Sequence, residues 1–597
     1  MGLSSTVGIA ASGLKATQAA TSVVSANIAG ASTDGYTAKT VSTQGIYTST
    51  GLIGLTTTVT RAFDQEVFDQ LASSTATSSY LDAKNTYLQQ IDSLLGSTES
   101  GAALPTALSD FSTDLQTLAA QPDSSAAQIA ATSSATVVAQ TLNSLSASLS
   151  DVGAAVDSSI SSAVDDVNTL TRQISDLNAQ IVSMQAQGSD VTGLEDARDK
   201  AVLDLSNYVD VEVKPQSDGT LRVSTSAGLT LVDNGKATQL DLGSDGTIRL
   251  ASPTGTGADV IATGLVTSGS LAGLVAVRDT ILPQVQNQLD QVAAGLASAL
   301  SDTTTSGTAV TSGAQAGYDV DTSDLASGNR LTLTYTDVAT NTQKTVTLVK
   351  VTDAGSLPLS DSATLDPNDT VVGVDFSGGM ASVTAQIQAA LGSNFSVSNT
   401  SGGTIRILDD GTGTVSVDAV TKTVTQTDEQ SGNSAVALFT DGSSYYTGSF
   451  DGGSQLDGLA SRIQVNSKIA SDPSLLVDYS TTTESGDPTR PTALYDALAD
   501  TKITTTLGNG LAAKSTTITS FANSMVSYWS GQASTQKTLV DNQSVVQSNL
   551  QSRMSAASSV DTDTELTKLI QLQNYYSANA QVLSTLRDML DTLVNAI

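Results

Sequence analysis

The feature that most constrains the fold is a long helical seam in residues 138–184. Apolar side chains recur there at steps of three and four, which places them along one face of an α-helix. The seam consists of Val138, Leu142, Leu145, Leu149, Val152, Val156, Ile160, Val164, Val167, Leu170, Ile174, Leu177, Ile181 and Met184. A continuous helix over this range would be about 70 Å long, and Gly153 would weaken it by roughly 1 kcal/mol without breaking it. The sequence therefore predicts a mainly α protein with an elongated helical scaffold.

Both ends of the chain show the same helical periodicity. The N-terminal series is Leu3, Val7, Ala10, Leu14, Thr17, Thr21, Val24 and Ile28. The C-terminal series is Leu566, Leu569, Leu572, Tyr576, Ala580, Leu583, Leu586, Leu590, Leu593 and Ile597. The mean step of the second series is close to 3.5, the repeat of a coiled coil. We expect Gly30 to end the first helix and Thr33–Tyr36 to form a turn.

The two terminal helices carry few charges, and Lys15 is the only charged residue among the first 33. Two interpretations remain open for such helices. They can pair inside one globular domain, or they can pack against other subunits. The weak charge and the seam that continues to the last residue favour packing between subunits. We expect the N- and C-terminal helices to pair as a coiled coil.

Further helices are predicted between these segments. They lie at about 63–95, 104–119, 278–301 and 510–552, with a helix returning over 194–208 after a hairpin at Gly188–Asp190. Helical periodicity resumes near Leu456 after the strands described next.

Strand patterns occupy two other parts of the chain. The first covers 209–250, where residues 209–213 and 221–224 alternate around an Asp218-Gly219 turn. The second covers 311–445, with strands predicted at 331–335, 346–351, 405–407 and 415–417 and one short helix at 381–391. We therefore expect a mostly β domain inserted into the helical scaffold.

Composition excludes most catalytic chemistry. The 597 residues include no Cys and no His, so disulfides, thiol nucleophiles, Cys-bearing zinc sites and Ser-His-Asp triads are absent. Two Ser-x-x-Lys matches, at Ser12 and Ser534, are expected by chance in a Ser-rich chain, and Asp409–Gly411 and Asp451–Gly453 are better explained as turns than as calcium loops. A net charge of −33 argues against nucleic-acid binding. We expect no enzymatic activity, no cofactor and no metal site.

The sequence shows no membrane-spanning segment and no cleaved secretory signal. No window of about 20 apolar residues occurs, and the first residues lack a basic region followed by an apolar one. The absence of Cys suits either a cytosolic protein or one exported without oxidative folding.

Several segments resemble the flagellar axial proteins, the family of rod, hook and hook-associated proteins. At the N-terminus these are Ser12–Ala16, Ser25–Gly30 and Thr33–Tyr36, although Ala26 and Asp34 replace the Asn and Pro of the family pattern. At the C-terminus they are Leu569–Ala580 and Met589–Leu593.

Interior segments resemble the hook-associated branch of that family. They are Leu177–Ile181, Leu194–Lys200, Val209–Val213, Asp218–Thr220, Gly269–Leu274, Arg278–Pro283, Arg462–Asn466 and Asp472-Pro473. The likeness covers about three-quarters of the chain and excludes roughly 311–445.

This resemblance implies a structural protein that forms a ring at the hook–filament junction and connects the hook to the flagellin filament. The implied partners are identical subunits, hook protein, the next hook-associated junction protein and an export chaperone. Export through the flagellar type III channel to an extracellular position is implied as well. The alternatives are another axial protein, such as hook protein or a flagellin-like protein, or a secreted adhesin or carbohydrate-active enzyme with a coiled-coil stalk.

Three domains follow from these considerations. Residues 1–60 with 555–597 are expected to form a terminal coiled-coil domain that lines a channel. Residues 61–310 with 446–554 form the scaffold, and 311–445 form the outer β domain. The expected assembly interface comprises Leu3, Val7, Leu14, Val24, Asn27, Ile28, Gly35, Tyr36, Leu569, Leu572, Tyr576, Asn579, Ala580, Leu583, Leu586, Leu590 and Leu593.

Overall fold

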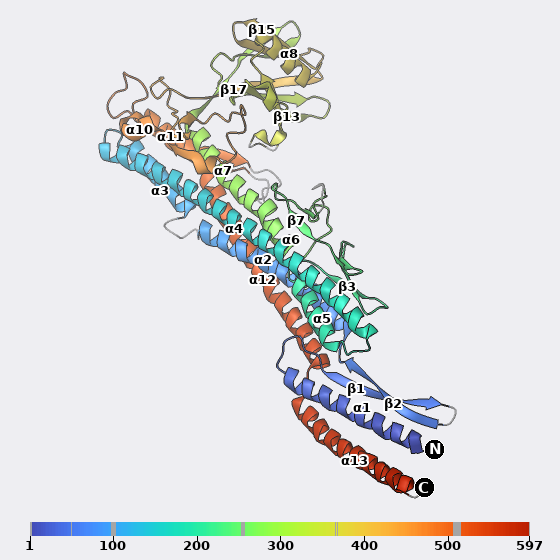
Figure 1. Cartoon of the computed structure of the whole chain (residues 1–597). Coiled ribbons are helices and arrows are strands. Elements are labelled where there is room, and N and C mark those ends of the chain that lie inside the picture. The colour runs from blue at the N-terminus through green and yellow to red at the C-terminus, as the bar shows by residue number, and fades with distance from the viewer. Residues whose placement is uncertain are drawn as a thin grey trace. The chain divides into compact units, whose positions relative to one another are not determined.

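The structure is a computed structural model (Figure 1) that describes residues 3–48, 51–96, 103–251, 257–364, 366, 368–504 and 515–595. It is about 53% helix and 21% strand, which confirms a mainly α, multi-domain protein with β insertions. The chain divides into two compact units. Unit 1 contains Met1–Thr86, Ala155–Val277 and Thr535–Ile597, and unit 2 contains Tyr87–Ala154 and Arg278–Ser534.

The central helix confirms the predicted seam and extends it at the N-terminal end. Helix α4 runs without interruption over Ser125–Ala186, through Gly153. Most of the apolar residues of the seam are buried, whereas Met184 near the C-terminal end is exposed. After the turn at Gly188, which adopts a positive φ of 70°, α5 (Thr192–Ser206) returns as predicted.

Unit 1 also holds both ends of the chain. Its further elements are α1 (Leu3–Gly30), β1 (Lys39–Thr48), β2 (Gly51–Arg61), α6 (Ser270–Ala276), α13 (Thr562–Asn595) and the parts of α2 (Gln65–Leu95) and α12 (Ile518–Ser558) within its bounds. Strands β1 and β2 form an antiparallel hairpin in which Lys39 pairs with Arg61. Helix α1 ends at Gly30 and the Thr33–Tyr36 turn follows, both as predicted.

A small β subdomain packs beside α4 and α5 in unit 1. Its strands are β3 (Glu212–Pro215), β4 (Leu221–Ser224), β5 (Thr230–Asp233), β6 (Lys236–Ala237), β7 (Leu240–Leu242) and β8 (Ile248–Leu250). The predicted 209–213 strand begins three residues late, at Glu212, because the Val209 N–H still donates to the Leu205 carbonyl at the end of α5 (3.2 Å). The buried Asn178 of α4 holds β4 through hydrogen bonds with both the N–H and the C=O of Leu221 (3.0 and 2.9 Å).

Unit 2 has a helical part that buries the only Trp. Its elements are α3 (Leu104–Ala120), the π-helical turn η1 (Val277–Ile281), α7 (Leu282–Ser301), β18 (Phe439–Asp441), β19 (Ser444–Tyr445), α9 (Leu459–Arg462), β20 (Ile463–Val465), α10 (Ser467–Ser471), η4 (Pro473–Leu476), α11 (Thr489–Asp500), β21 (Lys502–Thr504) and β22 (Ser515–Thr517). Trp529 donates its indole N–H to Gln288 (2.8 Å), and Phe111 meets Phe439 edge to face.

The β module of unit 2 consists of two sheets with a common core. One sheet has the order β14-β13-β12-β17-β9 and the other β10-β11-β16-β15. The elements are β9 (Asp302–Ser306), β10 (Thr308–Ser312), β11 (Gln315–Asp321), β12 (Arg330–Asp337), β13 (Thr342–Val351), η2 (Ala354–Ser356), η3 (Asp361–Ala363), β14 (Asp369–Asp375), α8 (Met380–Leu391), β15 (Phe395–Ser401), β16 (Thr404–Asp409) and β17 (Val415–Thr425). The module begins and ends at one place, because Asp302 pairs with Thr425 and Gln426 donates to the carbonyl of Ser301.

Two differences from the sequence expectations concern element ends. The helix predicted at 510–552 begins at Ile518, since Ser515–Thr517 form strand β22, and it continues to Ser558. The start of that prediction, 510–514, lies outside the described residues. The four strands and the helix predicted between 331 and 417 are all present.

Candidate assembly site

The two terminal helices lie side by side and antiparallel within unit 1 (Figure 1). Asn27 near the end of α1 contacts Glu565 near the start of α13, and Thr17 contacts Asn579 farther along (3.4 Å). The helices are in contact at Gly13, where a Cβ would lie at an ordinary van der Waals distance of 3.5 Å from the Asn579 side chain. The coiled-coil geometry of this pair stays a prediction.

Helix α13 buries only one side of its surface. Leu586 is 5% exposed, whereas Leu590, one turn farther on, is 38% exposed. A second apolar stripe flanks the side that meets α1, about 40–60° around the helix from Asn579 and Leu586. Its residues Tyr575, Val582 and Met589 are exposed at intervals of seven residues. That interval is the repeat by which one helix packs along another. The described part of this chain places no covering element over the stripe.

The side chain of Asn27 is fully buried where the end of α1 meets the start of α13. Its amide nitrogen donates to the carbonyl of Lys39 (2.8 Å) and to Glu565 (3.0 Å). Its oxygen accepts from the Lys39 N–H (2.9 Å) and the Tyr36 hydroxyl (3.0 Å). These four hydrogen bonds use the donor and acceptor capacity of an amide completely, so one residue joins α1, the turn, β1 and α13.

Charged groups surround this amide on the side of α5. Asp196 accepts hydrogen bonds from the Thr37 hydroxyl (2.6 Å) and the Lys39 ammonium (2.8 Å) and forms an ion pair with Arg61 (3.3 Å). Arg61 also contacts Asp199 (2.6 Å) and Glu195 (3.1 Å). We call Asn27, Tyr36, Lys39, Arg61, Glu195, Asp196, Asp199 and Glu565 the polar joint.

Burial changes the acid–base behaviour of two groups in the polar joint. Desolvation raises the pKa of Asp199, and the opposing charge of Arg61 only partly offsets the shift. Desolvation likewise raises the pKa of Tyr36, although the Lys39 ammonium, which lies 3.8 Å from the centre of the Tyr36 ring, lowers it. Buried charges of this kind are tolerated only when they are paired.

The structure places the expected interface residues in three environments. Buried within the chain are Val24, Asn27 and Leu586. Half-buried are Val7, Leu14, Ile28, Tyr36, Leu569, Leu572, Asn579, Ala580 and Leu583. Exposed are Gly35, Tyr576 and Leu590. The side chains of Leu3 and Leu593 lie outside the described residues.

The charged members of the polar joint escaped the sequence-based interface prediction. Lys39, Arg61 and Asp196 are far apart in sequence, and their contacts arise only from the fold. One sequence feature could have pointed to them. Charged residues are only 14% of this chain, so a charge next to a turn or hairpin indicates a position where a specific ion pair is expected.

Side chains of the motifs considered for catalysis form hydrogen bonds that stabilise local structure. Ser12 donates to the Ile9 carbonyl (2.9 Å) and accepts from the N–H of Leu55 in β2 (3.0 Å), which ties α1 to the hairpin. Asp410 accepts from the hydroxyl of Thr412 (2.7 Å) within its turn. Among the described residues, no group of three or more acidic side chains is arranged to hold a metal ion.

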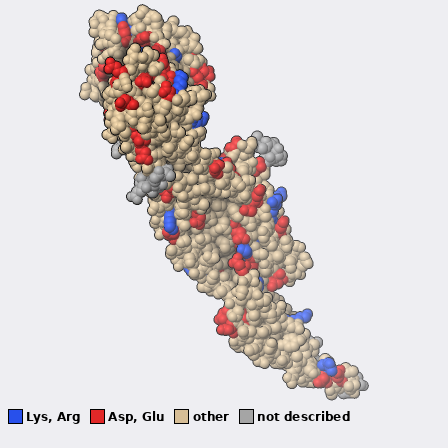
Figure 2. Space-filling model, turned by 90° about the vertical axis from the view of Figure 1, so that its left-hand side faces the viewer, with Lys and Arg blue, Asp and Glu red and all other residues tan. Residues whose placement is uncertain are grey.

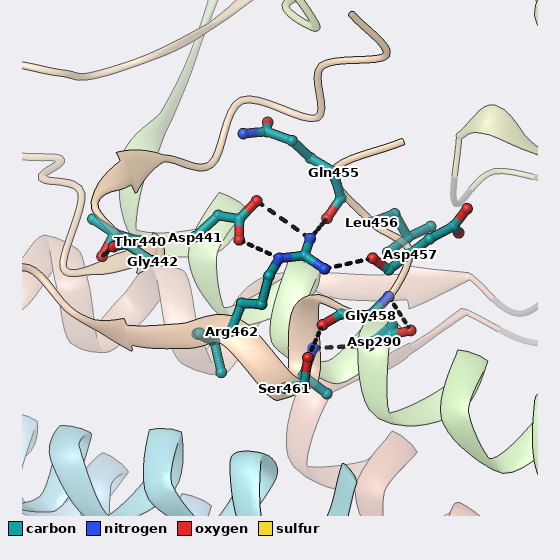
Figure 3. Close-up of polar contacts among 12 residues, drawn as sticks. Asp290, Thr440, Asp441, Gly442, Gln455, Leu456, Asp457, Gly458, Ser461 and Arg462 are labelled. Atoms are coloured by element: carbon teal, nitrogen blue, oxygen red, sulfur yellow. Dashed lines mark hydrogen bonds and ion pairs between the residues drawn. The ribbon is translucent and has the colours of Figure 1, made fainter. Parts of the chain in front are cut away.

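A second polar cluster organises the Arg462–Asn466 motif in unit 2 (Figure 3). Arg462 forms an ion pair with Asp441 (2.7 Å) and donates to the carbonyl oxygens of Asp457 and Gln455 (2.8 and 3.0 Å). Asp290 of α7 accepts from two backbone N–H groups of the same segment (2.9 and 2.8 Å). This motif therefore fixes the chain segment that enters α9.

Three family models match this chain. Residues 88–321 match the helical domain of flagellar hook-associated protein FlgK, residues 551–596 the C-terminal region of the basal body rod proteins FlgEFG, and residues 9–37 a flagellar basal body rod protein. Within the described residues, no helix has the length and hydropathy to cross a membrane.

Curated relatives carry the same family name. Flagellar hook-associated protein 1 of Escherichia coli is 27% identical over 99% of this chain and 100% of the relative. That of Salmonella typhimurium is 33% identical over 51% of this chain and 57% of the relative. A solved structure of the hook junction protein FlgK from Burkholderia pseudomallei has a TM-score of 0.44 and 17% identity, covering 81% of this chain and 99% of that one. The helical-domain match, the two terminal matches and the full-length relative agree, so this chain is similar along its length to flagellar hook-associated protein 1, a structural component of the flagellum.

Proposed function

We propose that this chain forms a ring of identical subunits at the hook–filament junction and connects the hook to the flagellin filament. The observation that carries the proposal is the outer stripe of α13. Tyr575, Val582 and Met589 stay exposed at heptad spacing although the helix that carries them is already packed against α1. Apolar side chains that stay exposed in one subunit are buried when a neighbouring subunit packs against them.

The energy available from such a contact is large when it is repeated. Complete burial of one large apolar side chain stabilises by about 1.5–3 kcal/mol. Every subunit of a ring would contribute the same stripe, so a modest gain per subunit becomes a strong preference for the assembled state. The polar joint supports the proposal because it holds α1 and α13 in one defined arrangement before a neighbour arrives.

The proposed partners are identical subunits, hook protein, the next hook-associated junction protein and an export chaperone. We place the chain outside the cell, after export as an unfolded polypeptide through the flagellar channel. The proposed role needs no enzymatic activity, cofactor, nucleic acid or membrane insertion. The excess of acidic side chains, visible on the face drawn in Figure 2, supports the exclusion of nucleic acid.

Localisation tests this proposal most simply. Flagella are isolated from cells that produce an epitope-tagged form of the full chain and are labelled with gold-conjugated antibody for electron microscopy. We expect label in a narrow band where the hook meets the filament, and hooks without filaments in a deletion strain. Label along the whole hook or the whole filament would favour another axial role and contradict the proposal.

A further inference from the structure

We infer that the tip of the β1–β2 hairpin docks into the groove between α2 and α12 of a second copy of this chain. The inference rests on the proposed function, because it names a contact that would join neighbouring subunits. It concerns surfaces other than the terminal helices.

The hairpin tip is an exposed apolar protrusion. Ile46 is 45% exposed, Tyr47 is 74% exposed and Ile53 is 41% exposed. The strand register shifts here: Ile46 pairs with Gly54 and Tyr47 with Leu52, which leaves Ile53 as an extra residue. Such a bulge turns its side chain away from the regular faces of the hairpin. Three large apolar side chains thus project from the end of a hairpin whose base is held by the polar joint.

The hairpin is also free of charge. No Asp, Glu, Lys or Arg occurs from Thr40 to Thr60, although the whole chain carries a net charge of −33. Two copies of such a chain repel one another over most of their surfaces. An uncharged surface is where an identical copy can approach without that cost, so a second copy suits the tip better than it suits the rest of the molecule.

The groove between α2 and α12 has the complementary form. It is an open depression of about 740 Å³, lined by Ser73, Ser74 and Thr77 of α2 and by Gln543, Val546 and Leu550 of α12. Val546 is exposed and Leu550 half-buried, so the α12 wall offers apolar contact. The lining segments 71–81 and 542–552 contain no charged residue, and Asp69 and Arg553 also line the groove.

The walls of the groove are already fixed within one subunit. Gln543 donates to the carbonyl and the hydroxyl of Ser74 (3.1 and 2.9 Å), and Gln547 donates to the Thr75 hydroxyl (3.2 Å). Gln536 donates to the Leu81 carbonyl (2.8 Å) farther along. A partner that enters the groove therefore meets a preorganised surface and loses little to rearrangement.

Shape separates this acceptor from the outer stripe of α13. Side chains at heptad spacing, such as Tyr575 and Val582, suit a second helix, whereas a compact tip suits a depression. Each subunit has one tip and one groove, and these are different surfaces. The contact is therefore heterologous, which is the kind that generates rings when the rotation closes.

Cysteine cross-linking tests the contact directly, because the chain contains no native cysteine. Flagella are isolated from cells producing the full chain with both Tyr47→Cys and Val546→Cys and are then oxidised. We expect a ladder of disulfide-linked multimers of this chain on non-reducing gels. Coexpressed single variants should give a dimer that requires both, and neither single variant should cross-link alone.

Two other cross-linking patterns would overturn the inference. A ladder from Tyr47→Cys with Tyr575→Cys, but not with Val546→Cys, would move the tip onto the terminal helix. A dimer from Tyr47→Cys alone would mean a symmetric tip-to-tip contact. Absence of every cross-link in flagella that carry the protein at the hook–filament boundary would also overturn the inference while leaving the proposed function intact. Absence of the protein from that boundary would contradict the proposed function instead.

A charge variant provides an independent readout. Tyr47→Asp puts a charge on the tip, and we expect at least a tenfold drop in the fraction of hooks that carry filaments, with the melting temperature of the monomer unchanged. Ser42→Asp, on an exposed position of the same hairpin, should stay within twofold of the parent. Equal behaviour of the two variants would overturn the inference.

Discussion

The polar joint and the outer stripe of α13 both involve the terminal helices, but their side chains are in opposite environments. At the polar joint, the buried Asn27 has all four of its hydrogen-bonding positions occupied, and Asp196 bridges Thr37, Lys39 and Arg61. Along α13, Tyr575, Val582 and Met589 stay exposed beside the residues that meet α1. One region is complete in a single chain and the other is not.

This difference assigns different tasks to the two regions. Buried polar groups cost free energy unless every partner is in place, so the polar joint permits one arrangement of α1, α13 and the hairpin. Burial of an apolar stripe is favourable whatever the exact geometry of the partner, because the hydrophobic effect is non-directional. The polar joint therefore fixes the orientation of α13 relative to α1 and the hairpin. The outer stripe supplies the apolar surface that binds a neighbouring subunit.

The largest expected effect is on assembly through α13. Leu590→Asp places a charge at a position that is 38% exposed in one chain and, in our proposal, buried by a neighbour. Filaments should be lost and flagellin should appear in the medium, while the monomer's melting temperature changes little. Leu586→Asp, at a position already buried within one chain, should instead destabilise the monomer itself.

The control for this comparison is Asn595→Asp, an exposed position near the end of α13, which should be much milder. Motility, filament counts and monomer melting are measured for the three variants. Normal filaments with Leu590→Asp, or a large loss of stability in its monomer, would contradict the proposal. Either result would mean that α13 packs only within its own chain.

The next largest effect is on stability at the polar joint. Asp196→Ala leaves the Lys39 ammonium without its ion-pair partner in a buried position. Removal of one member of a buried pair costs about 3–5 kcal/mol, which urea unfolding would measure. Asp204→Ala, on the same helix and in a solvent-exposed pair with Lys200, should cost less than about 1 kcal/mol. Similar costs for the two would contradict a distinct role for the joint.

A smaller effect is expected from a single hydroxyl. Tyr36→Phe removes the hydrogen bond to the Asn27 oxygen, which keeps the N–H of Lys39 as a donor. The free energy of unfolding should fall by about 1 kcal/mol. Tyr47→Phe, at the exposed hairpin tip, should leave it unchanged in the monomer. A fall as large as that of Asp196→Ala would mean that the hydroxyl does more than bind Asn27.

The smallest effect concerns pH and Asp199. Burial raises its pKa in the folded state above the unfolded value, so the folded state takes up the proton first. Ionised Asp199 then costs stability above the folded pKa, and this cost disappears as the pH falls through that pKa. Relative to Asp199→Asn, the parent should gain stability between pH 7 and pH 4. Unfolding in urea at both values measures the difference, and a relative loss in the parent would reverse the assigned sign.

Periodicity was sufficient for the long helices, but it missed the β1–β2 hairpin and was insufficient for the polar joint. The α4 seam was predictable because burial along a helix repeats every three or four residues, and Leu142, Val156 and Ile174 are fully buried. The start of α12 was wrong because residues 515–517 extend a small sheet instead. The link between Asn27 and Glu565 spans 538 positions, and no local pattern carries such a contact.

The outer stripe of α13 illustrates the same limit. The series from Leu566 to Ile597 is apolar at helical spacing, so the helix itself was predictable. Which side meets α1 depends on where α1 lies, and this is set by the polar joint. Tyr575, Val582 and Met589 therefore emerged as the exposed stripe only from the fold.

Amide hydrogen exchange of the monomer and of the assembled ring tests the central claim most directly, since it reports local opening at each backbone N–H. In the dilute monomer, peptides from 27–39 should be strongly protected, and peptides from 570–590, which pack on one side only, should be less protected. On assembly, the first group should change little and the second should become strongly protected. Equal protection of 570–590 in the monomer and in the ring would contradict the claim that a neighbouring subunit completes α13.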